Sequence, residues 1–527
     1  MVTRTRLTRR GYVVLGSLPA FLVAGMLQGA SAGRIEISAD GPPANVLVDA
    51  EGAAALAFRA RVTPAERLDR VRLTLDGDDV LDRAELEADG ETLVYRPQGA
   101  GDGVHRVEVR VDRGLGLPDA RARWTFEIDT APPRLRLADV PDEIPIDQPV
   151  EIAGAVDGEA VVTVGGQPVQ LRDGGFSVSY PMPPPGPVQV VATDPAGNQT
   201  TADVPITVAI PEVRGVHVTA AAWATPSLRD PILRMIEEGR ITAVELDIKD
   251  ESGVVGYDSQ VPLAREIGAV KALYDLGETV RTLHDLGVRV IGRLVCFRDP
   301  VHAEAAWEAG ERDQVIQTPA GGPYADYGGF TNFAHPQVRA YQIDLAEEAA
   351  AAGFDEILYD YVRRPDGPLE TMVFPGLQGT PEAAIASFLG ETRQRLRARR
   401  ALLGASVFGI AATRPLEIAQ DIPAMARHVD YIAPMLYPSH WRRGEYDVAD
   451  PNGQPYDIVF RSLQDFQSAV AGSDTRIVPW LQDFSLGRAY GPDQVRAQIQ
   501  AARDVGIDEW LLWDPKVTYT AAALERR

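Results

Sequence analysis

Apolar and polar residues alternate in short runs over the first 210 residues of the chain. Turn residues separate these runs, as is typical of β-sandwich domains. The runs are Ala54 to Val62, Val71 to Leu75, Val104 to Val111, Trp124 to Ile128, Val150 to Ala155, Phe176 to Tyr180 and Val188 to Ala192. A turn at Asp129-Thr130-Ala131-Pro132-Pro133 divides the runs into two groups. The pattern therefore predicts two all-β, immunoglobulin-like sandwiches, over residues 34–130 and 131–210.

After Pro211 the pattern changes, and apolar strands now alternate with amphipathic helices. Such alternation is typical of a parallel sheet covered by helices. The predicted strands are Gly215 to Thr219, Ala243 to Ile248, Val288 to Phe297, Asp355 to Tyr361, Leu403 to Ile410, Tyr431 to Tyr437, Ile477 to Phe484 and Glu509 to Asp514. The clearest helices are Pro336 to Ala352, Pro381 to Arg400, Asp457 to Ala471 and Pro492 to Val505. Because eight strands close a barrel, residues 211–527 are predicted to form a (β/α)8 TIM barrel.

The first 33 residues have the order of an export signal. Arginines at positions 4, 6, 9 and 10 precede an apolar run from Gly11 to Leu27, and the small residues Ala30-Ser31-Ala32 follow. A basic start, an apolar segment and a small-residue cleavage site define a secretory signal peptide. An uncleaved segment of this length is an alternative, as a membrane tether. The remainder is therefore expected to be periplasmic, extracellular or anchored at the membrane and facing outward.

Charge and cysteine content exclude several classes of function. The chain has 52 Lys and Arg against 75 Asp and Glu, a net charge of −23, so it is not expected to bind nucleic acid. Its one cysteine, Cys296, excludes an intrachain disulfide and is expected to be a buried apolar residue. The seven histidines show no spacing typical of metal ligands, so neither a metal nor a cofactor is expected.

Polar and aromatic residues are dense where the predicted barrel strands end, which is where barrel enzymes carry their active sites. These candidates are Asp247, Lys249, Asp250, Arg293, Asp360, Arg363, Tyr437, His440, Trp480, Gln482, Asp483, Trp513 and Asp514. The two-residue period of a strand puts Asp247 and Lys249 together on the interior face. Carboxylates that exchange protons and aromatic rings that stack on sugars are the equipment of glycoside hydrolysis.

Each candidate also has a structural interpretation. An aspartate at a strand end often caps the next helix or pairs with an arginine. Asp355 and Glu356 open their strand, at the opposite end of the barrel, and are expected to be structural. His217, inside the first strand, is interpreted as a core histidine.

Ordered motifs carry a resemblance to a known family. They are Arg214-Gly215-Val216-His217, Asp247-Ile248-Lys249-Asp250 with Ser252-Gly253, Val261-Pro262-Leu263-Ala264, Phe354-Asp355-Glu356-Ile357 with Asp360-Tyr361-Val362-Arg363, Val407-Phe408-Gly409, Pro434-Met435-Leu436-Tyr437-Pro438-Ser439-His440 and Pro479-Trp480-Leu481-Gln482-Asp483-Phe484. Over Arg214 to Leu524 the chain resembles a bacterial TIM-barrel family of glycoside hydrolase type, long catalogued as a domain of unknown function. The resemblance implies membership of the glycoside hydrolase barrel superfamily. Two positions depart from the pattern, Arg364 in place of an aromatic residue and Ser406 in place of an aspartate.

The leading hypothesis is an O-glycosyl hydrolase that cleaves or transfers a glycosidic bond in a polysaccharide or oligosaccharide outside the cytoplasm. Asp360 is expected to be the principal catalytic carboxylate, with Asp483 or Asp247 as its partner and Asp250 and Asp514 as further alternatives. The other candidates would tune charge or hold the sugar. Two competing hypotheses are a non-catalytic polysaccharide-binding or envelope scaffold protein, which Ser406 would favour, and a sugar-modifying lyase.

Overall fold

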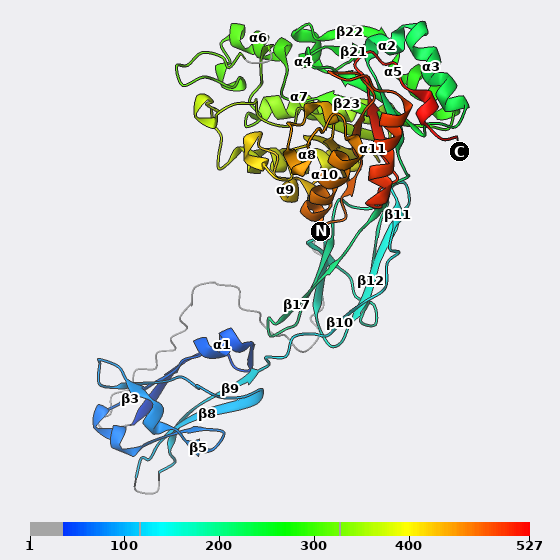
Figure 1. Ribbon diagram of the computed structural model, residues 1–527. Helices are drawn as coiled ribbons and strands as arrows, with labels where there is room; N and C mark the ends of the chain where they lie inside the picture. Colours follow the sequence, from blue (N-terminus) through cyan, green and yellow to red (C-terminus); the bar gives the residue numbers. More distant parts are fainter. Residues whose placement is uncertain (1–34, 115–116, 326–327, 527) are drawn as a thin grey trace, which may run out of the picture. The chain divides into compact units, whose positions relative to one another are not determined.

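The computed structural model describes residues 35–114, 117–325 and 328–526, which form two compact units (Figure 1). The described residues of the first unit are 35–141, 149–180 and 186–206, without 115–116, and those of the second are 142–148, 181–185 and 207–526, without 326–327. The predicted export signal lies outside the described residues. No helix within the described ranges is both long enough and apolar enough to cross a lipid bilayer.

The first unit begins with two sheets that share one apolar core. One sheet has the order β1-β3-β7-β6, with bounds Glu36–Asp40, Phe58–Thr63, Thr92–Tyr95 and Glu85–Leu86. The other has the order β2-β9-β8-β4-β5, with bounds Val46–Val48, Ala120–Ile128, Gly103–Val111, Val71–Leu75 and Asp78–Asp79. Strict alternation along β9 buries Trp124 and Phe126, which pack with Phe58 of the opposite sheet. This alternation leaves the outer face of the second sheet polar.

Two further sheets complete the first unit, and every predicted run of alternation overlaps one of its strands. Their orders are β10-β12-β15, with bounds Leu135–Leu137, Val150–Val156 and Gly175–Tyr180, and β14-β13-β16-β17, with bounds Gln167–Val169, Val161–Val164, Val188–Thr193 and Gln199–Val204. Valines and isoleucines on alternate positions are buried, as at Val162 and Val164. In the second unit, the short strands β11 (Ile144–Pro145) and β18 (Val208–Ala209) pair in parallel.

The second unit contains a closed barrel of eight parallel strands, as predicted. Their order is β19-β20-β23-β24-β25-β26-β28-β29, and β29 pairs with β19 to close the ring. The bounds are Arg214–Val218, Ala243–Lys249, Arg289–Val295, Glu356–Asp360, Leu402–Phe408, Tyr431–Met435, Trp480–Gln482 and Trp510–Trp513. The predicted seventh strand is divided into β27 (Arg476–Ile477) and β28. Every predicted barrel strand is thus confirmed, with ends that differ by a few residues.

Helices surround the barrel strands on the outside (Figure 1). The longer ones are α3 (Pro226–Glu237), α5 (Leu276–Asp285), α6 (Pro300–Ala309), α7 (Pro336–Ala351), α8 (Pro381–Arg397), α10 (Pro455–Val470) and α11 (Pro492–Asp504). Proline in the first turn opens most of them, because its fixed φ suits that position and its missing N–H has no helical partner there. The main apolar core lies between these helices and the strands, and the buried thiol of Cys296 is part of it, as expected.

Candidate active site

A cavity of about 680 Å³ opens at the carboxyl ends of the barrel strands. Its walls combine charged and aromatic side chains from five strands and from the loops beside them. Among the lining residues are Glu251, Arg293, Asp360, Tyr361, Arg363, Phe408, Tyr437, His440, Trp480 and Trp513. Seven of the predicted site residues therefore face one cavity, as the shared position at strand ends led us to expect.

Arg293 is the charged centre of this cavity. Its Nε and Nη2 both donate to Oδ2 of Asp360, at 3.0 and 2.7 Å. Its Nη1 donates to Oδ1 of Asp247 at 2.9 Å and lies 3.3 Å from Oε2 of Glu251. Three carboxylates thus share one guanidinium group that is only 2% exposed. Buried charge of this kind is tolerated only when it is paired and hydrogen-bonded.

Asp360 ends strand β24 at the floor of the cavity. Its Oδ1 accepts a hydrogen bond from the backbone N–H of Tyr361 at 2.7 Å, while its Oδ2 binds Arg293. Tyr361 has a φ of 47°, a left-handed conformation that costs a non-glycine residue free energy. The strained backbone directly after the strand thus helps to fix the Asp360 carboxylate. Residues held in this way cluster at functional sites.

Asp247 lies inside the barrel and does not line the cavity. Its Oδ1 binds both Arg293 and Nε2 of His217, the latter at 3.0 Å. Burial acts to raise the pKa of Asp247, but the neighbouring His217 and Arg293 outweigh it and hold the pKa below its ordinary value. His217 is 1% exposed, so its interpretation as a core histidine is correct, although it is bound directly to the charged cluster.

Glu245, two residues earlier on β20, is enclosed one layer deeper. Within the described part of the chain, neither of its carboxyl oxygens has a hydrogen-bond partner, and Nε2 of His217 lies 3.8 Å from Oε2. Burial raises the pKa of Glu245 well above its ordinary value and so favours the protonated form of the carboxyl group. The barrel interior therefore places a carboxyl group that favours its protonated form beneath the arginine and its three carboxylates.

Aromatic rings form the wall beside the carboxylates. Trp513 stacks on His217, with ring centroids 4.2 Å apart, and the guanidinium carbon of Arg293 lies 5.0 Å from the Trp513 ring. Trp480 packs edge-on against Trp513, and its indole N–H donates to Oγ of Ser406 at 3.0 Å. Ser406, at the position where related sequences suggested aspartate, therefore fixes an aromatic ring.

Arg363 and Arg364 have different environments. The guanidinium of Arg363 lines the cavity and lies between two rings, 4.7 Å from Tyr361 and 4.3 Å from Phe408. Arg364 is turned away, and it donates to the backbone carbonyls of Pro365, Gly367 and Leu416. Arg364, where an aromatic residue was expected, thus anchors the loop that follows β24.

Lys249 does not share the interior face with Asp247, so that prediction was wrong. The register between β20 and β23 shifts between Asp247 and Lys249, which marks a β-bulge. The bulge turns Lys249 to the helix side, where its Nζ binds Asp299 and Oε1 of Gln342 on α7. Lys249 is fully buried there and does not line the cavity.

Four other predicted residues also lie off the cavity lining. Asp250 accepts from the backbone N–H groups of residues 252 and 254, and Asp514 accepts from that of residue 516, so both stabilise turns. Asp483 accepts from N and Oγ1 of Thr520, the former at 2.7 Å. Gln482 accepts from the backbone N–H of Ser439 and so supports the loop that carries His440.

Glu251 is a cavity residue that sequence reasoning missed. It follows Asp250, whose side chain closes the tight turn 250–254, and this turn brings Glu251 to Arg293. Its side chain remains 43% exposed, in contrast to Asp247. The available signal was position alone, since Glu251 is the carboxylate directly after the predicted strand end. Within the described ranges, no group of three or more His, Cys, Asp or Glu side chains is placed to hold a metal ion.

Comparison with known proteins bears on the barrel. A family model described as "Putative glycosyl hydrolase domain" matches residues 215–519. A Ruminiclostridium thermocellum protein described as hypothetical has 32% identity over 36% of this chain and 96% of its own, with a TM-score of 0.33. The glycoside hydrolase domain of PgaB (BpsB) from Bordetella bronchiseptica has 15% identity over 58% and 95%, with a TM-score of 0.43. The α-galactosidase TtGalA from Thermus thermophilus has 14% identity over 81% and 89%, with a TM-score of 0.39. No curated protein matches the chain.

Proposed function

The chain belongs to this glycosyl hydrolase domain family, and from that premise we propose that it cleaves or transfers a glycosidic bond in a polysaccharide outside the cytoplasm. The reaction would use two carboxyl groups and no cofactor. Asp360 acts as the principal catalytic carboxylate, as nucleophile or as the base that activates water.

The observation that carries this proposal is the environment of Asp360. It is a carboxylate at the floor of a cavity, fixed by Arg293 and by the amide of Tyr361. The indole rings of Trp480 and Trp513 line the same cavity and offer apolar faces of the kind on which sugar rings stack. A carboxylate fixed by a guanidinium group beside such a wall is suited to stabilise an oxocarbenium-like transition state.

Glu251 is the best-placed second carboxylate. Glu251 and Asp360 bind the same guanidinium group, so their two carboxylates are separated by little more than that group. Both residues line the cavity. Catalytic pairs lie about 5 to 5.5 Å apart in retaining and about 6.5 to 9.5 Å apart in inverting glycosidases. Asp247 shares the same guanidinium but is enclosed, so we assign it to the positioning of Arg293 and His217.

Asp483 is assigned a structural role. Burial raises its pKa to about 6, a value that would suit a general acid. Both of its oxygens, however, accept hydrogen bonds from Thr520. These hydrogen bonds hold the segment after β29 in place. Because Asp483 does not line the cavity, a sugar bound there would not contact it.

The parts of the chain before the barrel would direct export of the enzyme and serve as spacer modules. We propose that residues 1–33 direct export or tether the chain, and that residues 34–130 and 131–210 are immunoglobulin-like modules. This proposal rests on the arginine-rich start and on the β-strand content of the first unit.

The test is a screen of the purified chain against bacterial and algal polysaccharides for new reducing ends. On a substrate found in this way, Glu251→Gln should lower kcat by at least about a hundredfold, whereas Asp483→Asn should stay within about threefold. Binding of a polysaccharide in the barrel without any release of reducing ends would contradict hydrolysis and favour a binding protein. A strong loss in Asp483→Asn with an intact Glu251→Gln would reverse the two assignments.

A further inference from the structure

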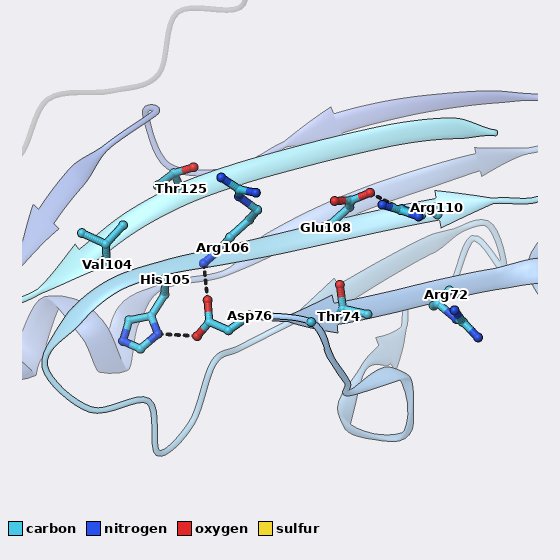
Figure 2. A pocket seen from close by; sticks show the side chains of 10 residues that line it. Arg72, Thr74, Asp76, Val104, His105, Arg106, Glu108, Arg110 and Thr125 are labelled. Carbon is cyan, nitrogen blue, oxygen red and sulfur yellow. Dashed lines mark hydrogen bonds and ion pairs between the residues drawn. The ribbon is translucent and has the colours of Figure 1, made fainter. Parts of the chain in front are cut away.

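The outer face of the five-stranded sheet in the first unit carries a cluster of arginines. Alternation along β8 buries Val107 and Val109, and it turns Arg106, Glu108 and Arg110 to the outside (Figure 2). A cavity of about 600 Å³ lies on this face. We name the cluster the arginine face, and it consists of Arg72 on β4, Arg106 and Arg110 on β8, and Arg121 and Arg123 on β9.

The strand register places arginines directly opposite one another. Arg72 pairs with Arg110 across β4 and β8, and Arg110 pairs with Arg121 across β8 and β9. Three guanidinium groups thus form a row across three adjacent strands. Like charges that face each other across strands are destabilising, so the sheet carries this row at a cost to its own stability. An external anion would remove that repulsion.

One carboxylate neutralises part of the face. Glu108 forms ion pairs with Arg110 and Arg123, and the side-chain hydrogen bond from Arg110 is the main cause that lowers the pKa of Glu108. Glu108 therefore remains ionised between two guanidinium groups. It is an example, within the protein, of how this face holds a carboxylate.

The charges of the other arginines have less compensation from nearby carboxylates. Within the described residues, no carboxylate forms an ion pair with Arg72 or Arg106, and Arg121 has only a distant one, 3.9 Å from Asp119. Asp76 lies close enough to interact with the charge of Arg106, but its carboxylate accepts the backbone N–H of Arg106, binds the ring of His105 and forms no ion pair with the Arg106 guanidinium (Figure 2). A cationic face remains on a chain whose net charge is −23.

We propose that the arginine face binds an acidic polysaccharide whose repeating sugars carry carboxylates. The inference rests on the proposed function, which it extends to the class of substrate. Guanidinium groups match carboxylates in a bidentate manner, and the row of Arg72, Arg110 and Arg121 presents three of them on adjacent strands. Thr74 and Thr125 line the same cavity with hydroxyl groups that suit sugar hydroxyls.

The composition of the cavity argues against a protein partner. Stable protein interfaces have an apolar core with aromatic anchors. The only apolar side chain that lines this cavity, among the described residues, is that of Val104, and no aromatic ring other than His105 contributes. A polyanion requires no such core, because its affinity comes from charge-assisted hydrogen bonds.

Binding of polygalacturonate to the full chain, measured by calorimetry, tests the proposal. All chains carry Asp360→Asn, so that no substrate is consumed and binding is read independently of hydrolysis. The double variant Arg72→Gln with Arg106→Gln should raise Kd at least about tenfold, since neither guanidinium group forms an ion pair in the part of the chain that the structure describes. The matched control, Arg59→Gln with Arg61→Gln on β3, removes the same charge from the other sheet and should stay within about twofold.

Wild-type binding should weaken as salt rises, and dextran, a neutral polymer, should not bind. Failure of polygalacturonate to bind, or equal losses in both double variants, would overturn the proposal. Tighter binding of polyphosphate would replace the carboxylate ligand by a phosphate polymer and would also overturn it. If the barrel proves inactive while these binding results hold, only the proposed hydrolysis fails.

Discussion

Two sites in this chain place arginine side chains in opposite environments, one buried and fully paired, the other exposed and mostly unpaired. In the barrel, Arg293 is 2% exposed and is bound to three carboxylates. On the outer face of the five-stranded sheet in the first unit, Arg72 and Arg110 face each other; Glu108 pairs with Arg110, and within the described residues no carboxylate forms an ion pair with Arg72. Burial makes an unpaired charge too costly to keep, whereas exposure to water tolerates a surplus. A buried arginine therefore uses its hydrogen-bond donors within the protein, whereas an exposed row of arginines is available to bind a ligand.

The largest expected effect concerns the carboxylate that Arg293 fixes. Asp360→Asn keeps the size of the side chain and removes its charge, so turnover on the identified polysaccharide should fall by at least about a thousandfold. The variant should fold normally, which circular dichroism would verify. Near wild-type turnover in this variant would remove Asp360 from the mechanism.

The second prediction compares the two arginine sites directly through stability. Arg293→Met leaves Asp247 and Asp360 without their shared cation and should lower the free energy of unfolding by about 3 to 5 kcal/mol. Arg72→Met, on the exposed row, should change it by less than about 0.5 kcal/mol. Urea unfolding at pH 7 measures both. Similar losses in the two variants would mean that burial does not distinguish the sites.

The third prediction uses the pH dependence of Asp483. Burial raises its pKa in the folded state from 3.8 to about 6, so the folded state binds the proton more tightly than the unfolded state does. Protonated Asp483 therefore favours folding below about pH 4. As the pH rises to about 6, this contribution to the free energy of unfolding, up to about 3 kcal/mol, is lost. Asp483→Asn should remove this slope, so the variant should gain relative to wild type between pH 4 and 7. An unchanged slope in urea unfolding would show that another group causes it.

The fourth prediction concerns Glu245, beneath the charged cluster. Because its pKa is raised well above the ordinary value of 4.5, folding keeps it protonated while the unfolded chain ionises. Wild-type stability should therefore fall as the pH rises above about 4.5. Glu245→Gln is neutral at every pH, and it should increase the free energy of unfolding at pH 7, with less effect at pH 4. A loss of stability at pH 7 would indicate that the carboxylate is ionised in the folded state.

The sequence by itself determined the architecture of the barrel. Each strand is a local apolar run between polar turns, and each helix begins with a proline or a polar cap, so the elements could be located without knowledge of their neighbours. Strand-end position likewise brought Asp360, Arg293 and Trp480 to one cavity, because parallel strands in a barrel end on the same side.

Only the tertiary structure decided which of those residues meet. A bulge in β20 turned Lys249 to the helices, and a turn closed by Asp250 brought Glu251 to Arg293. The partner of Asp483 is Thr520, which lies 37 residues further along the chain. These outcomes depend on backbone irregularities and on contacts between distant segments. Neither can be predicted from the local periodicity of the sequence. The row of arginines has the same origin, since alternation predicts that each side chain faces outward, whereas the register between strands decides that they face one another.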